Sequence, residues 1–188
     1  MIYFLIGGGA LAALFLNRET IALTVETAVA KQSSNWTLWD ADFKAAGAKY
    51  GVPWQWLKAV ALNESSLGSA KSVARGLVAP TDIEGSKSTD GKSWGLMQVT
   101  LTTGRGLDPF CTEVKLNDPK YSIDLGAKYI GQMSKRFSQV ETRYVEWVIK
   151  SYNQGPGNTD KEKSGKIAKG YADEYWDRFQ RNLQKVEA

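Results

Sequence analysis

The sequence contains no histidine, and this absence excludes several classes of enzyme. Ser-His-Asp and Cys-His catalysis both need an imidazole, and the usual zinc hydrolase sites depend on histidine ligands. The single cysteine, Cys111, cannot form an internal disulfide, and no neighbouring residue in the sequence would activate its thiol. We therefore expect a structural thiol, no metal and no cofactor. The chemistry left to the chain is that of carboxylates, which cleave glycosidic bonds.

A strong charge of one sign is also missing. The 24 basic and 20 acidic side chains leave a net charge of +4, which suits an anionic sugar polymer but also fits many soluble proteins. The lysines and arginines are scattered rather than gathered along one helix, so we expect no nucleic-acid partner. A length of 188 residues allows one domain of ordinary size together with a short anchor.

A long apolar run occurs at the start of the chain, where residues 1–16 carry no charge. As a helix this run would reach about 24 Å, which is less than a hydrocarbon core of about 30 Å, so spanning requires residues up to 30. We expect residues 1–30 to be a membrane anchor and residues 31–37 a linker. A cleaved signal peptide ending near residues 28–30 is the main alternative, and a fusion-like hydrophobic peptide is the third.

Residues 52–66 predict a helix with one carboxylate at the end of its apolar face. Leu57, Val60, Ala61 and Glu64 recur at helical spacing, which places the carboxylate on the buried side. Burial disfavours the charged form of a carboxylate, so the pKa of Glu64 should rise towards neutrality. Glu64 is therefore a candidate proton donor. The alternative is a partly exposed glutamate that only caps a neighbouring element.

Hydrophobic periodicity elsewhere predicts a mainly α fold, a single helical domain packed around the Glu64 helix. Residues 69–93 lack a period and predict a long loop, residues 94–99 an extended piece, and residues 108–117 an irregular segment. Asp118-Pro119 resembles an N-cap followed by a first helical residue, and residues 155–157 break a helix. Further helices are expected at about residues 39–50, 123–137, 143–152 and 167–186, the last with Tyr171, Tyr175 and Phe179 on one face.

Three short motifs occur in order along this domain: Glu64-Ser65, then Gly95-Leu96-Met97-Gln98, then Tyr152-Asn153-Gln154-Gly155. Together they resemble the soluble-type lytic transglycosylases (SLT domain), which belong to the goose-type lysozyme-like superfamily. The resemblance covers roughly residues 38–184. It implies a lysozyme-like α+β fold for residues 38–188. It also implies cleavage of the β-1,4 bond between N-acetylmuramic acid and N-acetylglucosamine, leaving a 1,6-anhydro end.

The resemblance also implies roles for individual residues. Glu64 would act as the acid and then as the base, without a second enzyme carboxylate. Gly95 would allow close approach of backbone to a sugar, and Gln98 would hydrogen-bond its hydroxyl or acetamido groups. Tyr152 and Asn153 would hold the Glu64 carboxyl and a sugar group. The substrate-binding residues expected are Ser65, Gly95, Met97, Gln98, Tyr152, Asn153 and Tyr171, with Met97 beside the acetamido group and Tyr171 lining the cleft.

One departure from the family affects the site. Residues 76–93 look like an insertion, which leaves open whether Ser66, Ser69 or Ser72 lines the cleft. The insertion also supports a rival enzyme, a hydrolytic muramidase in which an acidic residue there activates water. The candidates for this role are Asp82, Glu84 and Asp90.

The expected partners are peptidoglycan glycan strands and, through residues 1–30, a lipid membrane. The catalytic domain would then face the cell wall, in a bacterial periplasm or at a virion membrane. Secretion-apparatus or virion proteins are further possible partners. A rival of another class is a peptidoglycan-binding or assembly module that has kept the sugar cleft and lost turnover.

Overall fold

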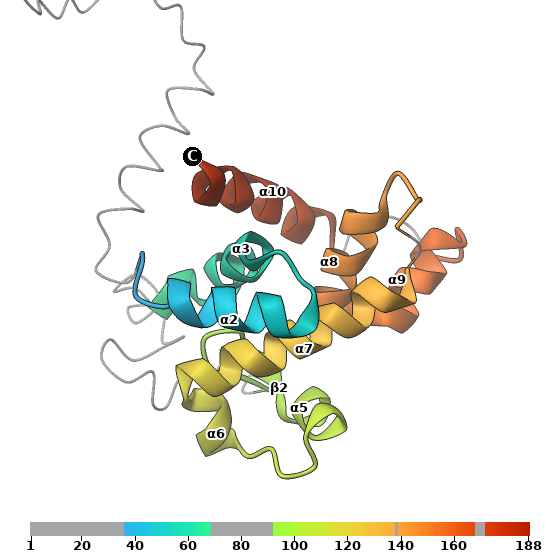
Figure 1. The fold of residues 1–188 in the computed structure, drawn as a ribbon. Helices are drawn as coiled ribbons and strands as arrows, with labels where there is room; N and C mark the ends of the chain where they lie inside the picture. Colours follow the sequence, from blue (N-terminus) through green and yellow to red (C-terminus); the bar gives the residue numbers. More distant parts are fainter. Residues whose placement is uncertain (1–35, 69–91, 138, 168–171) are drawn as a thin grey trace, which may run out of the picture.

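The helix that carries Glu64 lies at the centre of the domain in the computed structural model (Figure 1). This helix, α3, spans Trp54–Ser65 and begins directly after Pro53. Its apolar face is fully buried, as the spacing of Leu57, Val60 and Ala61 predicts. The helices that pack against it are α2, α7 and α10. The structure describes residues 36–68, 92–137, 139–167 and 172–188.

The mainly helical architecture is confirmed, and several helix ends follow local signals. Asp118 is an N-cap as predicted, because its carboxylate accepts a hydrogen bond from the Tyr121 amide at 2.8 Å. The last helix begins at Asp173, later than the predicted 167. The helices around α3 are α2 (Asp40–Tyr50), α5 (Leu101–Leu107), α6 (Glu113–Asn117), α7 (Pro119–Arg136), α8 (Tyr144–Gln154), α9 (Pro156–Lys163) and α10 (Asp173–Glu187), with a 3-10 turn, η1, at Ser66–Gly68.

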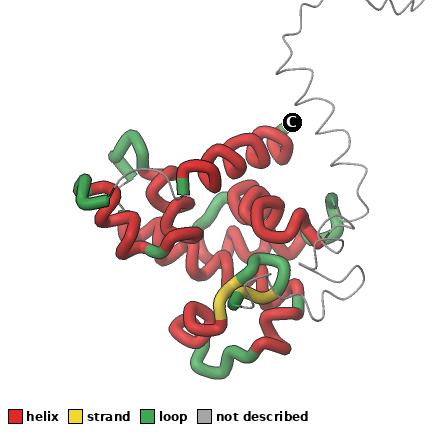
Figure 2. Tube along the Cα trace, turned by 180° about the vertical axis from the view of Figure 1, so that it is seen from behind, coloured by secondary structure: helices red, strands yellow, loops and turns green. Residues whose placement is uncertain are grey.

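A small antiparallel hairpin lies beside α5 and α6 (Figure 2). Strand β1, Ser93–Trp94, pairs with β2, Val99–Thr100, so that residues 95–98 form the connecting turn. The predicted extended piece over residues 94–99 is therefore two strand ends and a tight turn. This turn carries the Gly-Leu-Met-Gln motif.

A buried lysine ties the first described residue to α2 and α3. Lys58 is only 2% exposed, and its ammonium lies 2.7 Å from the Asp40 carboxylate and 4.3 Å from the centre of the Trp36 ring. An ion pair and a cation–π contact together satisfy this buried charge. The chain therefore enters the domain at a fixed point beside α3.

Within residues 36–68, 92–137, 139–167 and 172–188, no helix has both the length and the apolarity to cross a bilayer. The predicted anchor, residues 1–30, lies outside the described residues, as does most of the predicted linker.

Candidate functional site

Glu64 lies in the last turn of α3, where the buried face of the helix reaches the surface. The residue is partly exposed, while Ala61 and Ser65 on either side of it along the helix are fully buried. The helix then ends abruptly, because Ser66, Leu67 and Gly68 all have left-handed backbone angles, with φ of 52°, 56° and 67°. A left-handed serine or leucine costs roughly 1–2 kcal/mol. Glu64 therefore lies at the end of a helix, directly before a strained turn.

Tyr175 holds the Glu64 carboxyl in place from α10. Its hydroxyl donates a hydrogen bond to Glu64 Oε1 at 2.6 Å, and the ring is only 3% exposed. The neighbouring Asn63 fixes the register of the two helices, because its amide donates to the Tyr175 carbonyl at 3.0 Å. Asn63 also accepts from Asn182 at 2.7 Å. The acid and the phenol are therefore positioned by two packed helices rather than by loops.

Burial raises the pKa of Glu64 from 4.5 to about 7. Dense protein around the carboxyl disfavours its charged form, and the Tyr175 hydrogen bond and the positive charge of Arg178 offset part of this effect. Within the described residues, no second carboxylate contributes to the pKa shift. About half of the molecules therefore keep the proton at pH 7, which suits a general acid at neutral pH.

The turn of residues 95–98 packs directly against the end of α3. Ser65, fully buried, donates to the Leu96 carbonyl at 2.8 Å. Gln98 has a left-handed backbone, with φ of 48°, and its side-chain amide donates to the Gly95 carbonyl at 2.8 Å. Within the described residues, the non-glycine residues with positive φ are confined to Ser66, Leu67 and Gln98. Backbone strain therefore gathers around Glu64, as it commonly does at functional sites.

Gly95 is required by the packing of the protein itself. Its φ of 76° is left-handed, and a Cβ atom there would lie 1.8 Å from the Leu116 carbonyl oxygen. A close backbone approach is thus made by Leu116 in the last turn of α6, and the approach of Gly95 to a sugar stays a prediction.

Met97 and Tyr152 form the layer behind this turn. The Met97 side chain is fully buried. The Met97 backbone amide donates a hydrogen bond to Ser122 Oγ at 3.0 Å, so it also has an internal partner. The Tyr152 hydroxyl donates to the Met97 carbonyl at 2.7 Å, and its ring lies 5.7 Å from that of Tyr129. Burial and the nearby Glu64 charge raise the pKa of Tyr152 well above 10, so its hydroxyl stays protonated. Tyr152 therefore fixes the turn from α8.

The structure thus brings the three sequence motifs together, but it changes the parts that several residues play. Tyr175, rather than Tyr152, holds the Glu64 carboxyl. Ser65 and Met97 are fully buried, and the Ser65 hydroxyl has an internal partner, so neither side chain is exposed at the surface. Asn153 is exposed on α8 and remains available to one. Some predicted site residues lie outside the described part of the chain, and these are Tyr171, Ser69, Ser72, Asp82, Glu84 and Asp90.

Sequence reasoning placed Tyr175 only on a buried helix face and did not consider Arg178. The missed signal is their spacing, because residues three apart on a helix share one side. The Arg178 guanidinium lies 5.9 Å from the centre of the Tyr175 ring. The hydroxyl of this same tyrosine donates the hydrogen bond to Glu64.

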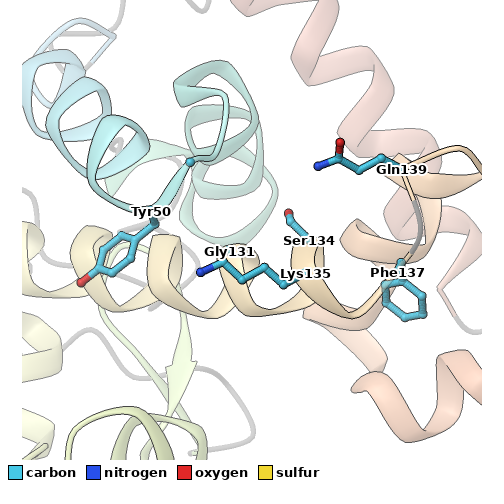
Figure 3. A pocket seen from close by; sticks show the side chains of 7 residues that line it. Tyr50, Gly131, Ser134, Lys135, Phe137 and Gln139 are labelled. Carbon is cyan, nitrogen blue, oxygen red and sulfur yellow. The ribbon is translucent and has the colours of Figure 1, made fainter.

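A separate hollow lies away from these residues (Figure 3). It is formed where the end of α2 meets the C-terminal half of α7, and Glu64 is not among its lining residues. The lining residues are Tyr50, Gly51, Gly131, Ser134, Lys135, Phe137 and Gln139.

Comparison with known proteins gives one family. The model of the transglycosylase SLT domain matches residues 42–174, which include α3, the hairpin turn, α8 and the first residues of α10. No curated protein matches the chain significantly.

Proposed function

The chain belongs to the transglycosylase SLT domain family, and from this premise we propose that it is a peptidoglycan lytic transglycosylase with Glu64 as its catalytic residue. The family match supports action on peptidoglycan. The observation that supports the chemistry is a single partly buried carboxyl, with a pKa of about 7, held by Tyr175 at 2.6 Å. The bond cleaved is the β-1,4 bond between N-acetylmuramic acid and N-acetylglucosamine.

In the first step the protonated Glu64 donates to the bridging oxygen as the bond to the muramyl C1 breaks. The N-acetylglucosamine side leaves as an alcohol, and the muramyl acetamido group assists from the substrate side. In the second step the Glu64 carboxylate accepts the proton of the muramyl C6 hydroxyl, whose oxygen bonds to C1. The product is a 1,6-anhydro sugar, water is not consumed, and Glu64 is again protonated.

Partial burial suits both steps of this cycle. A carboxyl whose pKa lies near the working pH can both give and take a proton. The Tyr175 hydrogen bond is compatible with both states, because a phenol donates to a carboxylate and to the carbonyl oxygen of a carboxylic acid alike. A second carboxylate is not needed, since the nucleophile is the C6 hydroxyl of the substrate itself.

Digestion of purified peptidoglycan sacculi by the full-length chain tests this proposal. We expect muropeptides with 1,6-anhydro ends, each lighter by one water than a hydrolysed end, when the products are measured by mass spectrometry. Reducing ends alone would instead identify a hydrolytic muramidase, with a water-activating residue such as Asp82, Glu84 or Asp90. No cleavage, with retained binding to sacculi, would identify a wall-binding module.

The place of action is a second part of the proposal. Residues 1–30 would anchor the chain in a membrane, with the catalytic domain facing the cell wall of the periplasm or projecting from a virion membrane. The apolar, uncharged start of the sequence supports an anchor. Local opening of the wall for a secretion apparatus, or for bacteriophage entry or exit, would use an enzyme held in this way.

Replacing Tyr175 by phenylalanine should change how activity depends on pH. Activity requires protonated Glu64, so kcat/KM of the unaltered chain should fall as pH rises above about 7. The Tyr175 hydrogen bond lowers the pKa of Glu64, so its removal should raise that pKa and move the alkaline limb to higher pH. The maximum should also fall by about tenfold, because the carboxyl loses its positioning contact.

The matched control is Tyr144→Phe. The Tyr144 hydroxyl donates to the Ser134 carbonyl at 3.3 Å, away from Glu64, so this variant should keep the original pH profile. A limb that stays in place or moves to lower pH in Tyr175→Phe would contradict the arrangement.

A further inference from the structure

One charged pocket lies on the exposed side of α10. It is lined by Glu174, Asp177, Arg178 and Arg181, all of them exposed. Their spacing of three, one and three residues places them along one side of the helix. The pocket therefore presents two carboxylates followed by two guanidinium groups.

Arg178 connects the pocket to the catalytic carboxyl through Tyr175. The Arg178 guanidinium lies 5.9 Å from the centre of the Tyr175 ring, and the Tyr175 hydroxyl donates to Glu64. Arg178 is close enough for its charge to act on Glu64. Arg181 follows one turn later on the same side of α10.

Both arginines are available to a ligand. Within the part of the chain that the structure describes, neither guanidinium forms a salt bridge, although Glu174 and Asp177 stand at the spacing where helical pairs often form. A guanidinium binds a carboxylate through two parallel hydrogen bonds, which gives direction as well as charge. An exposed pair of arginines beside a sugar-cleaving acid therefore suits a carboxylate carried by the substrate.

We propose that Arg178 and Arg181 bind a free carboxylate of the short peptide that branches from the muramyl sugar, while Glu174 and Asp177 face its amino groups. This inference rests on the proposed function, because Glu64 must act at the muramyl C1. The peptide begins on that same sugar ring, and two extended residues reach about 7 Å, which is longer than the 5.9 Å between the Arg178 guanidinium and the ring of Tyr175, the residue that holds Glu64. The mixed charge of the pocket favours a peptide with both groups over a uniformly anionic polymer.

Binding to a full-length Glu64→Gln chain tests the inference without turnover and without a titrating residue at position 64. Three probes are compared by calorimetry: uncrosslinked glycan strands with free peptide carboxylates, the same strands with those carboxylates amidated, and strands stripped of peptide. We expect the free-carboxylate strands to bind about tenfold more tightly than the other two, because each exposed charge pair contributes modestly. The added change Arg178→Gln with Arg181→Gln should reduce this preference to less than about twofold, and added salt should weaken it.

The matched control is Lys161→Gln, which removes an exposed positive charge on α9. It should keep the preference, and Arg178→Lys with Arg181→Lys should keep part of it. A preference that is absent in the parent, or that survives loss of both arginines, overturns the inference. Cleavage by the chain with Glu64 intact is assayed separately on the same strands. Cutting without preference would overturn the inference alone, whereas an arginine-dependent preference without cutting would overturn the proposed function alone.

Discussion

Glu64→Gln should lower kcat on peptidoglycan by about 10³-fold or more, because an amide can neither donate the proton to the leaving oxygen nor accept one from the C6 hydroxyl. The change keeps the size of the side chain, and the Tyr175 hydroxyl can still donate to the amide oxygen. Binding of glycan strands should therefore change little. Release of anhydro-muropeptides from sacculi, followed by mass spectrometry, measures the loss.

The same change should stabilise the fold at neutral pH. The pKa of Glu64 is raised from 4.5 to about 7, so the folded chain holds this proton more tightly than the unfolded chain does. The stability that this proton provides is complete below about pH 4.5 and is lost as pH rises towards 7. Above pH 7, Glu64→Gln should be the more stable protein by up to about 3 kcal/mol, a gain that disappears near pH 4.5.

Denaturant unfolding at pH 4.5 and pH 8 separates this effect from a general change in packing. Glu113→Gln is the matched control, because Glu113 is exposed in the first turn of α6. It should affect neither activity nor the pH dependence of stability. Wild-type turnover in Glu64→Gln would exclude Glu64 as the catalytic acid.

Periodicity in the sequence predicted the central helix because the apolar spacing of Leu57, Val60 and Ala61 reports directly which side of a helix is buried. It could not tell which polar group meets the carboxyl at the end of that face. Tyr152 and Tyr175 both lie on helix faces directed inward, and the hydroxyl that reaches Glu64 depends on how α8 and α10 cross α3. That geometry is a tertiary property, so the motif order favoured Tyr152 while the structure gives Tyr175.

The short helices were missed for a different reason. α5, α6 and α9 have few turns and no extended apolar face, so a periodic pattern does not reveal them. Two of them begin at a threonine cap, since Thr100 and Thr112 accept hydrogen bonds from Thr103 and Lys115. α9 begins with a proline after glycine, a pair that signals the start of a helix as well as the break that the sequence predicts. The starts of these short helices are therefore signalled by capping residues and not by hydrophobic periodicity.

The burial of one charged side chain, Lys150, could not be predicted from the sequence either. Lys150 lies on α8 among residues that suggest an ordinary amphipathic helix, yet its side chain is fully buried. Its ammonium contacts three carboxylates. It lies 2.7 Å from Glu162 and 3.1 Å from Glu146, and it donates a hydrogen bond to Asp173. These carboxylates converge as they would on a metal ion, and the lysine supplies the cation. The cluster therefore joins α8, α9 and the first turn of α10.

Lys150→Met should destabilise the fold by about 3–5 kcal/mol at pH 7, because it leaves the buried Glu162 and the partly exposed Glu146 and Asp173 without their central cation. Burial opposes the charged lysine, but hydrogen bonds to Asp173, Glu162 and Glu146 outweigh it and raise the pKa of Lys150 above 10.5. Although burial raises the pKa of Glu146, hydrogen bonds from Arg143 and Lys150 lower it further, so without the lysine this carboxyl should take up a proton more readily. The deficit should therefore shrink as pH falls towards 4, in contrast to a packing defect, which would persist.

Denaturant unfolding across this pH range measures the effect, and two variants sharpen it. Lys49→Met removes the exposed partner of Asp124 in a salt bridge of 2.7 Å, so it should cost less than about 1 kcal/mol. Adding Glu162→Gln to Lys150→Met should recover part of the lost stability, since one buried charge fewer remains unpaired. Because Asp173 lies two residues before Tyr175, loosening the cluster should also lower activity by displacing the start of α10 from Glu64. A stable, fully active Lys150→Met protein would show that the cluster does not hold the site together.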